Sequence, residues 1–246
     1  MITCRSFKLG KSPARVDART LKFRAYLAQL PPTPVTRDWT TKVPDWLILA
    51  NDVVGDCTCA AAAHLDMLWT SWASTVVLPT DAAVLAAYTA ITGYNPADPS
   101  TDTGANELDV LNYWRQTGIL GRKITAYVQL EPRNLDHIKA AINLFGGVYA
   151  GVQLPDSAMR EFDEELPWSD VSENASDGHA IPLVAYDADT VTCITWGRKQ
   201  VISNTWLAKY LDEGYAVLSP DWIAANALAP SGFDLPQLTE DLKLVS

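Results

Sequence analysis

The stretch "NDVVGDCTCAAAAHLDMLW", residues 51–69, changes midway from a polar turn to a run of small and apolar residues. Gly55 and Asp56 belong to the turn, and mostly strong helix formers follow from Cys57 onward. This pattern predicts a buried helix from Cys57 to about Ser74. A thiol therefore stands at the first turn of a helix, where free N–H groups and the helix macrodipole stabilise an anion.

The thiol of Cys57 has two interpretations. In the first it is a nucleophile that reacts as the thiolate, and in the second it is a small buried hydrophobe, as most free cysteines are. The chain has four scattered cysteines: Cys4, Cys57, Cys59 and Cys193. They form no disulfide framework, which favours a reducing compartment or indifference to redox conditions. Cys59 is expected to fill the core.

A thiolate nucleophile needs a proton partner, and the chain has three histidines. His64 lies two helical turns beyond Cys57, too far to reach the thiol, and is expected to be packed or capped. His137 stands near a helix start and is expected to be solvated. His179, in "SDGHAIPLVAYD", opens an apolar strand and is held rigidly there, so it is the histidine that suits a general base.

Cys57, Cys59 and His64 also raise the question of a zinc site. Residues i and i+2 of a helix point to different sides, and no second CxxC or HxxxH cluster exists. Phosphate-binding loops are absent too, since "FGGV" is no P-loop and no GxGxxG follows a strand. We therefore expect no metal and no cofactor.

Composition narrows the class of partner. The chain has 246 residues, a 48% apolar share and a formal net charge of −10. An acidic balance argues against nucleic acid, which requires a basic face. The N-terminal stretch lacks the apolar segment of a signal peptide, and no run is long enough to span a membrane. We expect a protein without a membrane partner that is cytoplasmic or virion-associated.

The two halves of the chain differ in hydrophobic period. Helices are expected first, in "TDAAVLAAYTAI" with Thr80 or Asp81 as N-cap, in "NELDVLNYWRQTGI" closed by Gly118, and in "LDHIKAAINLFGG". Short strands are expected later, in "VYAGVQL", "AIPLVAYD", "TVTCITWG" and "YAVLS". Helices followed by strands, without βαβ alternation, predict an α+β fold with an antiparallel sheet.

These patterns divide the chain into an extension and one domain. Residues 1–30 are expected to form a basic N-terminal extension with a short helix near "ARTLKFRAYLAQL". This extension has three interpretations: a short inhibitory arm, a segment that docks a partner, or a solvated tail. A single domain is expected over 31–246. Its helical half covers about 31–130, its sheet half about 131–225, and a C-terminal tail the rest.

The order "RDW…NDVVGDCTCAA…DGHAIPLVAYD…TWG…EGYAVLS" resembles the papain-like cysteine peptidases over roughly residues 31–220. The matching pairs and triplets are Asp38-Trp39, Gly55-Asp56-Cys57, His179-Ala180, Trp196-Gly197 and Gly214-Tyr215. The sequence pattern "NDxxGDC" is similar to that of a branch of the family found in bacteria and phages. The spacing after His179 is similar to that in the bacteriocin-processing type of cysteine peptidase. The resemblance implies a helical half, with a central nucleophile helix, packed on an antiparallel sheet half.

The resemblance also implies catalytic roles. Cys57 takes the position of the nucleophile and His179 that of the general base. Asn51 falls where the family has its oxyanion-hole glutamine and is one methylene shorter. The third catalytic position, Asn or Asp in the family, has no direct match. Thr195, at the end of the strand, is the residue expected to orient the imidazole, while Asn204 lies beyond the Trp-Gly turn.

Substrate contacts are implied around the nucleophile. Gly104, in "TDTGAN", resembles the glycine loop that binds substrate backbone, and its other interpretation is an ordinary turn glycine. Gly55 and Asp56 are also expected to bind substrate. Thr58 departs from the family, because an aromatic residue usually follows the nucleophile.

Two functions remain open at the level of sequence. The first is a cysteine peptidase or amidase whose Cys-His pair carries out acyl transfer on a peptide or protein substrate. The second is a catalytically weak or inactive protein that keeps the fold as a structural or binding module, such as a phage virion component with an assembly partner. A fold alone does not establish the activity.

Overall fold

The computed structural model of the chain describes residues 7–27, 29–131, 133–175, 177–226 and 233–244. Its helices are α1 (Cys57–Ala73), α2 (Asp81–Thr92), α3 (Glu107–Gln116), α4 (Leu135–Phe145), α5 (Asp156–Asp163), α6 (Asn204–Tyr210), α7 (Pro220–Asn226) and α8 (Leu235–Leu242). Three short 3-10 helices are η1 (Phe23–Tyr26), η2 (Thr40–Lys42) and η3 (Pro99–Thr101). Within the described residues, no helix is long and apolar enough to cross a bilayer.

The strands of the described residues form one seven-stranded sheet in the order β2-β7-β3-β4-β5-β6, with β1 pairing to β4. They are β1 (Arg37–Asp38), β2 (Ala126–Gln129), β3 (Val148–Leu154), β4 (Asp177–Tyr186), β5 (Thr190–Thr195), β6 (Arg198–Ser203) and β7 (Leu211–Leu218). Every pairing between these strands is antiparallel. The predicted α+β class with an antiparallel sheet is confirmed.

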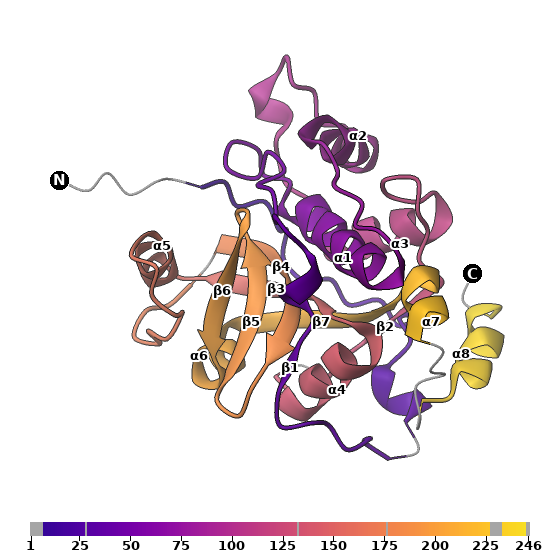
Figure 1. Ribbon diagram of the computed structural model, residues 1–246. Helices are drawn as coiled ribbons and strands as arrows, with labels where there is room; N and C mark the ends of the chain where they lie inside the picture. The colour runs from indigo at the N-terminus through magenta and orange to yellow at the C-terminus, as the bar shows by residue number, and fades with distance from the viewer. Residues whose placement is uncertain (1–6, 28, 132, 176, 227–232, 245–246) are drawn as a thin grey trace.

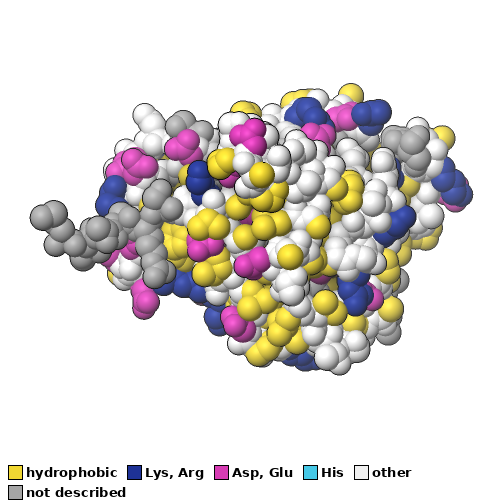
Figure 2. Space-filling view, turned by 90° about the horizontal axis from the view of Figure 1, so that it is seen from above, with side chains coloured by type: hydrophobic (Ala, Val, Ile, Leu, Met, Phe, Trp, Pro, Cys, Tyr) yellow, Lys and Arg dark blue, Asp and Glu magenta, His cyan; other side chains and the backbone are white. Residues whose placement is uncertain are grey.

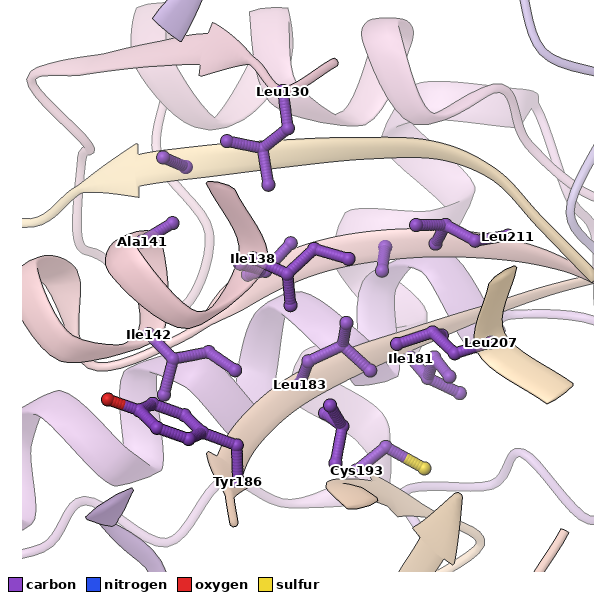
Figure 3. Packing of buried hydrophobic residues seen from close by; sticks show 14 of the residues in the cluster. Leu130, Ile138, Ala141, Ile142, Ile181, Leu183, Tyr186, Cys193, Leu207 and Leu211 are labelled. Carbon is purple, nitrogen blue, oxygen red and sulfur yellow. The ribbon is translucent and has the colours of Figure 1, made fainter. Parts of the chain in front are cut away.

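Helices cover both faces of the sheet (Figure 1). On one face, Ile138 and Ile142 of α4 point toward Leu183 of β4 (Figure 3). On the other face, Tyr149 and Tyr215 pack with the residues of α1, α2 and α3. Successive residues of a strand point to opposite faces, so the central strands supply apolar side chains to two cores at once. The central strands are therefore almost continuously apolar.

Several expected elements match closely. Helix α1 begins at Cys57, strand β3 spans the whole of "VYAGVQL", and the hydroxyl of Thr80 caps α2 by accepting the N–H of Ala83. Gly118, with φ of 104°, directly follows the C-cap residue of α3. The patterns did not predict β2, β6 or the helices from α5 onward.

The N-terminal segment is integrated with the domain. Phe23 and Tyr26 of η1 are buried against Phe233, and Lys11 is buried near the other end of the segment. The helix expected near residues 18–30 is the single turn of η1.

Two helices end in the same way, at a glycine in the left-handed region. Gly93 caps α2 with φ of 79°, and Gly146 caps α4 with φ of 81°. A Cβ at Gly93 would meet nothing within 4 Å, whereas a Cβ at Gly146 would lie 2.9 Å from the Trp222 ring. That ring is fixed, because its Nε1 donates to the Leu144 carbonyl at 2.8 Å.

We expect Gly146→Ala to lower the free energy of unfolding by about 1–3 kcal/mol more than Gly93→Ala, as overpacking typically does. Both substitutions place alanine in the same strained backbone conformation, so their difference isolates the contact with Trp222. Urea unfolding of the two variants measures it. Equal losses would contradict the close packing of α4 on Trp222.

Candidate active site

The candidate nucleophile lies where α1 meets β4. Cys57 is the first residue of α1 and is 1% exposed. Its Sγ accepts the backbone N–H of Ala180 at 3.4 Å. Because Ala180 follows His179 in β4, the structure brings the candidate nucleophile and the candidate general base to adjacent positions.

The imidazole of His179 has two different environments. Its Nε2 lies 2.8 Å from Thr195 Oγ1, and its Nδ1 has no hydrogen-bond partner among the described residues. The ring stacks on Trp196, with centroids 4.6 Å apart and an interplanar angle of 18°. Thr195 and Trp196 thus fix the plane of the ring and occupy one nitrogen, while the other nitrogen has no partner among the described residues.

The turn between β5 and β6 sets the position of these two residues. Thr195 pairs with Arg198, so Trp196 and Gly197 form a two-residue hairpin loop. Both loop residues have positive φ, 45° and 79°, as a type I′ turn requires. The turn leaves Thr195 at the end of its strand and directs the tryptophan ring onto His179.

Burial keeps the candidate pair neutral in this structure. It raises the pKa of Cys57 to about 12, and the N–H groups of Ala180 and Gly10 offset this only in part. Burial also lowers the pKa of His179 to about 3. Burial therefore disfavours both the thiolate of Cys57 and the imidazolium of His179 in this arrangement.

Asn51 faces the turn rather than the thiol. Its Nδ2 donates to the carbonyl of Val54 and to Asp56 Oδ1, both at 3.2 Å. Burial raises the pKa of the Asp56 carboxyl well above its usual value, although the Asn51 amide lowers it. Both amide hydrogens of Asn51 are therefore engaged, and its oxyanion role stays a prediction. Asp56 is fully buried, and its role as a substrate contact also stays a prediction.

Residues 7–13 pass through this site. A Cβ on Gly10 would lie 1.7 Å from the carbonyl oxygen of Gly55, and one on Gly104 would lie 2.2 Å from the carbonyl oxygen of Gly10. The two glycines that the sequence singled out for substrate binding therefore both lie against Gly10. Each close approach requires a residue without a side chain.

Backbone hydrogen bonds tie this segment to both halves of the fold. The N–H of Lys11 donates to the Gly178 carbonyl at 3.1 Å, on the sheet side. On the helical side, Ser12 donates to the Ala105 carbonyl at 2.9 Å, and Ala105 donates to the Gly10 carbonyl at 2.8 Å. The segment is thus bound as an extended strand would be.

The segment also has a definite direction. Phe7 stacks on Trp196 with ring centroids 4.6 Å apart, at the His179 end of the site. At the other end, Asn106 Nδ2 donates to the Pro13 carbonyl at 2.9 Å, and Arg15 pairs with Asp109 of α3. The chain therefore runs from His179 toward α3.

Comparison with solved structures identifies the architecture. Xylellain, a cysteine protease from Xylella fastidiosa, superposes with a TM-score of 0.68 at 14% identity, over 89% of this chain and 98% of that one. Procathepsin L 3 from the larval midgut of Tenebrio molitor gives 0.60 at 10% identity, over 83% and 75%. The Carica candamarcensis cysteine protease CMS1MS2, in complex with E-64, gives 0.56 at 13%, over 76% and 99%.

The chain has a papain-like fold. No protein-family model matches its sequence, and no curated protein matches it by sequence. The likeness is therefore one of structure. Two of the motifs that carry the resemblance, those with Cys57 and Ala180, meet where α1 contacts β4. The expected packing of a central helix on an antiparallel sheet half is confirmed.

The other histidines lie away from the papain-like site. His64 is buried, with its Nε2 2.7 Å from the Trp46 carbonyl, as its expected packing requires. The expected solvation of His137 is wrong, because it is 1% exposed and packs edge-on against Phe23. The apolar face of α4 and η1 cover it. On the face of the molecule in Figure 2 no histidine side chain is visible, in keeping with the burial of all three.

Of the remaining sequence expectations, Cys59 lies fully buried in the core with α1, and Cys4 falls outside the described residues. Within the described part of the chain, no group of three or more His, Cys, Asp or Glu side chains is arranged to hold a metal. The sequence left the role of the N-terminal extension open between an inhibitory arm, a partner-docking segment and a solvated tail, and it did not single out residues 7–13. Gly10 was the available signal, and its pairing with Gly55 and Gly104 depends on the tertiary fold.

We expect Thr195→Val to lower the free energy of unfolding by about 1–3 kcal/mol, because it leaves the buried Nε2 of His179 without a partner. Thr192→Val is the matched control. Thr192 lies half-buried on the same strand, and no described residue accepts or donates a hydrogen bond at its hydroxyl. Urea unfolding of both variants tests the bond, and equal effects would contradict it.

Proposed function

We propose that this protein is a cysteine peptidase or amidase of papain-like fold, and that the arrangement described here is its latent form. The observation that carries the proposal is the environment of His179. One ring nitrogen is held by Thr195, and the other, Nδ1, is unpartnered beside the strand position that contacts Cys57. A general base next to a nucleophile has this asymmetry.

In the proposed reaction, His179 Nδ1 takes the proton of the Cys57 thiol. The thiolate attacks a substrate carbonyl carbon, and the negative charge of the tetrahedral intermediate develops on the carbonyl oxygen. His179 then donates its proton to the leaving amine, and an acyl-enzyme thioester remains. Water, deprotonated by His179, hydrolyses the thioester and regenerates the thiol.

Oxyanion stabilisation in this scheme comes from the backbone N–H of Cys57, at the free N-terminus of α1. Asn51 contributes a second donor only after releasing one of its bonds to Val54 or Asp56. Thr195 orients the imidazole through a neutral hydroxyl, which stabilises an imidazolium less than a carboxylate does. We therefore propose a peptidase of modest rate.

Latency follows from the path of residues 7–13. Acyl transfer expels the amine toward the general base, so a productive substrate extends its C-terminal residues toward His179 and Trp196. The segment does the reverse, with Phe7 on Trp196. The Gly10 carbonyl is bound by the N–H of Ala105 and is turned away from attack. The segment occupies the site without presenting a cleavable bond.

A second function is a non-catalytic binding or structural module that uses the papain-like fold. The engagement of both Asn51 amide hydrogens within the turn favours it, since no side-chain donor then serves an oxyanion. The two proposals differ in one property. Only the peptidase gains turnover when residues 7–13 leave the site.

Gly10→Val in the full chain is the sharpest test. Its side chain cannot fit against the Gly55 backbone, so we expect the segment to leave the site and peptide hydrolysis to rise at least about tenfold over the intact protein. A mixture of fluorogenic peptides reports the rate. Adding Cys57→Ala to Gly10→Val should abolish it.

Lys8→Val is the matched control, because Lys8 is exposed in the same segment and its replacement leaves the segment bound. Circular dichroism establishes that each variant is folded. Hydrolysis that persists after Cys57→Ala would overturn the nucleophile assignment. A folded Gly10→Val variant without hydrolysis would favour the binding module.

A further inference from the structure

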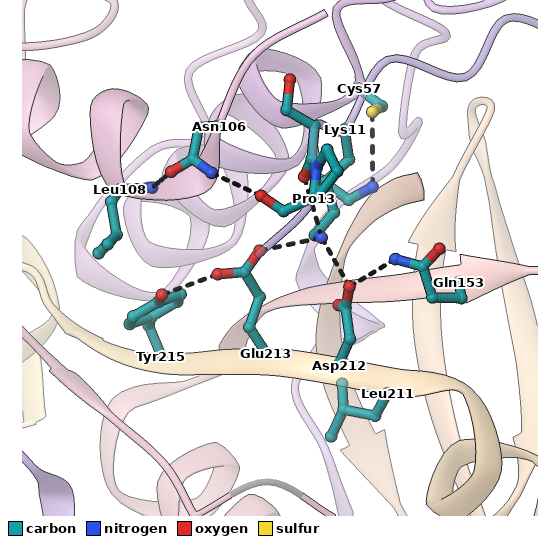
Figure 4. A network of polar contacts seen from close by, with 12 residues as sticks. Lys11, Pro13, Cys57, Asn106, Leu108, Gln153, Leu211, Asp212, Glu213 and Tyr215 are labelled. Carbon is teal, nitrogen blue, oxygen red and sulfur yellow. Dashed lines mark hydrogen bonds and ion pairs between the residues drawn. The ribbon is translucent and has the colours of Figure 1, made fainter. Parts of the chain in front are cut away.

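The side chain of Lys11 points away from residues 7–13 and lies against acidic residues between the two halves of the fold (Figure 4). Its Nζ lies 2.9 Å from Asp212 Oδ2 and 2.9 Å from Glu213 Oε1, and 3.3 Å from the Ser12 carbonyl. The side chain is fully buried. We call Asp212, Glu213 and Glu107, with the space that holds the ammonium, the lysine cage.

A bulge in the sheet builds the lysine cage. Gly151 of β3 pairs with Glu213 and the next residue, Val152, pairs with Leu211, so Asp212 is an extra residue on β7. Neighbouring residues of a regular strand point to opposite faces, and a bulge re-aims one of them. The bulge therefore lets two consecutive carboxylates reach the same ammonium.

The aliphatic part of the Lys11 side chain fits beside β3 because Gly151 has no side chain. A Cβ on Gly151 would lie 1.9 Å from Lys11 Cε, and one on Gly178 would lie 2.2 Å from the Lys11 carbonyl oxygen. Both glycines belong to the sheet half. The wall of the cage is thus shaped for a long, unbranched side chain.

Two neighbours hold the carboxylates in place independently of Lys11. Gln153 Nε2 donates to Asp212 Oδ2 at 2.6 Å, and the Tyr215 hydroxyl donates to Glu213 Oε2 at 2.8 Å. These bonds come from β3 and β7 and remain when the N-terminal segment leaves. The cage is therefore preorganised for a cation.

Glu107 adds a third carboxyl group at the start of α3. It is fully buried, and neither of its oxygens has a hydrogen-bond partner among the described residues. Burial and the charge of Glu213 raise the pKa of Glu107 well above its usual value. Burial alone would lower the pKa of Lys11, but the charges of the three acidic groups outweigh it and raise that pKa.

We propose that the lysine cage is the specificity site of the cleft, and that once residues 7–13 leave, it binds a lysine side chain of a peptide substrate. This inference rests on the proposed function, whose substrate class it names. Lys11 occupies the place that the substrate lysine takes. Removing an ammonium without replacement leaves buried carboxylates unpaired, so the open cleft favours a ligand that restores the charge pair.

The cage also fixes which part of the substrate carries the lysine. Along residues 7–13, Phe7 comes first, Gly10 follows, and the lysine cage comes after Gly10, on the side of α3. The leaving amine departs on the opposite side, toward His179. The selected lysine therefore belongs to the acyl side of the cleaved bond, within the two residues that precede it.

Norleucine is the matched probe, because it keeps the apolar stem of lysine and lacks the ammonium. We use the double variant Gly10→Val/Lys11→Met of the full chain, in which the segment is expelled and cannot refill the cage. Fluorogenic peptides carrying lysine or norleucine at either of the two acyl-side positions report kcat/KM. We expect lysine to be preferred at one position by on the order of 100-fold, as for a buried charge pair.

Glu213→Gln in the same background should reduce that preference at least about tenfold, because it removes a charge and keeps the shape of the side chain. Glu240→Gln is the control, since it removes an exposed charge on α8 and should leave the preference unchanged. Hydrolysis without a lysine preference would overturn the lysine cage and leave the peptidase proposal standing.

A binding measurement decides the matter without catalysis. Fluorescence anisotropy follows a labelled peptide with the sequence of residues 7–15, carrying lysine or norleucine at position 11, added to the double variant with Cys57→Ala. Tighter binding of the lysine peptide, by at least tenfold, supports the cage even if no peptide is hydrolysed. Equal binding, or none by either peptide, overturns it.

Discussion

The ion pairs between Lys11 and the acidic residues of β7 hold the N-terminal segment of this papain-like fold between its two halves. Buried ion pairs contribute little net stability, but losing one partner leaves an unpaired charge, which is strongly unfavourable. Lys11 therefore fixes the path of residues 7–13, and that path places Gly10 against Gly55, beside the candidate nucleophile. Without solvent, Cys57 and His179 both stay neutral. In the proposed function, one buried cation thus connects substrate recognition with the protonation state of Cys57 and His179.

Local patterns in the sequence were sufficient to predict the framework of the site. Helix α1 starts at Cys57 because the polar turn ends there and alanines follow, and β3 is apolar throughout because both of its faces are buried. The order of motifs along the chain indicated that His179 and Thr195 share a site, and the structure places their side chains 2.8 Å apart. These features depend on residues that are close in sequence, or on the order of the strands along the chain, which the order of the motifs follows.

Other features depend on contacts that no local pattern contains. Strand β6, "RKQVIS", lies at the edge of the sheet and is rich in polar residues. The alternation of apolar and polar residues that identifies a strand is therefore not recognisable in its sequence. The bulge at Asp212 arises from its register with β3, and the partner of Lys11 lies near the other end of the chain. The burial of His137 results from packing against η1, which a helix-start pattern cannot reveal. In each case a distant segment changes the environment of a residue.

In the proposed latent form, residues 7–13 keep the thiol of Cys57 from reacting. The most direct measurement is the rate of alkylation of Cys57 by iodoacetamide at pH 6, followed by peptide mass spectrometry in the intact chain and in Gly10→Val. Cys193, fully buried in the sheet, is the internal reference. We expect Cys57 to react as slowly as Cys193 in the intact chain and at least about 100-fold faster in the variant, because a thiolate forms once water and His179 reach it. Equal rates for both cysteines in a folded Gly10→Val variant would show that residues 7–13 do not restrain Cys57.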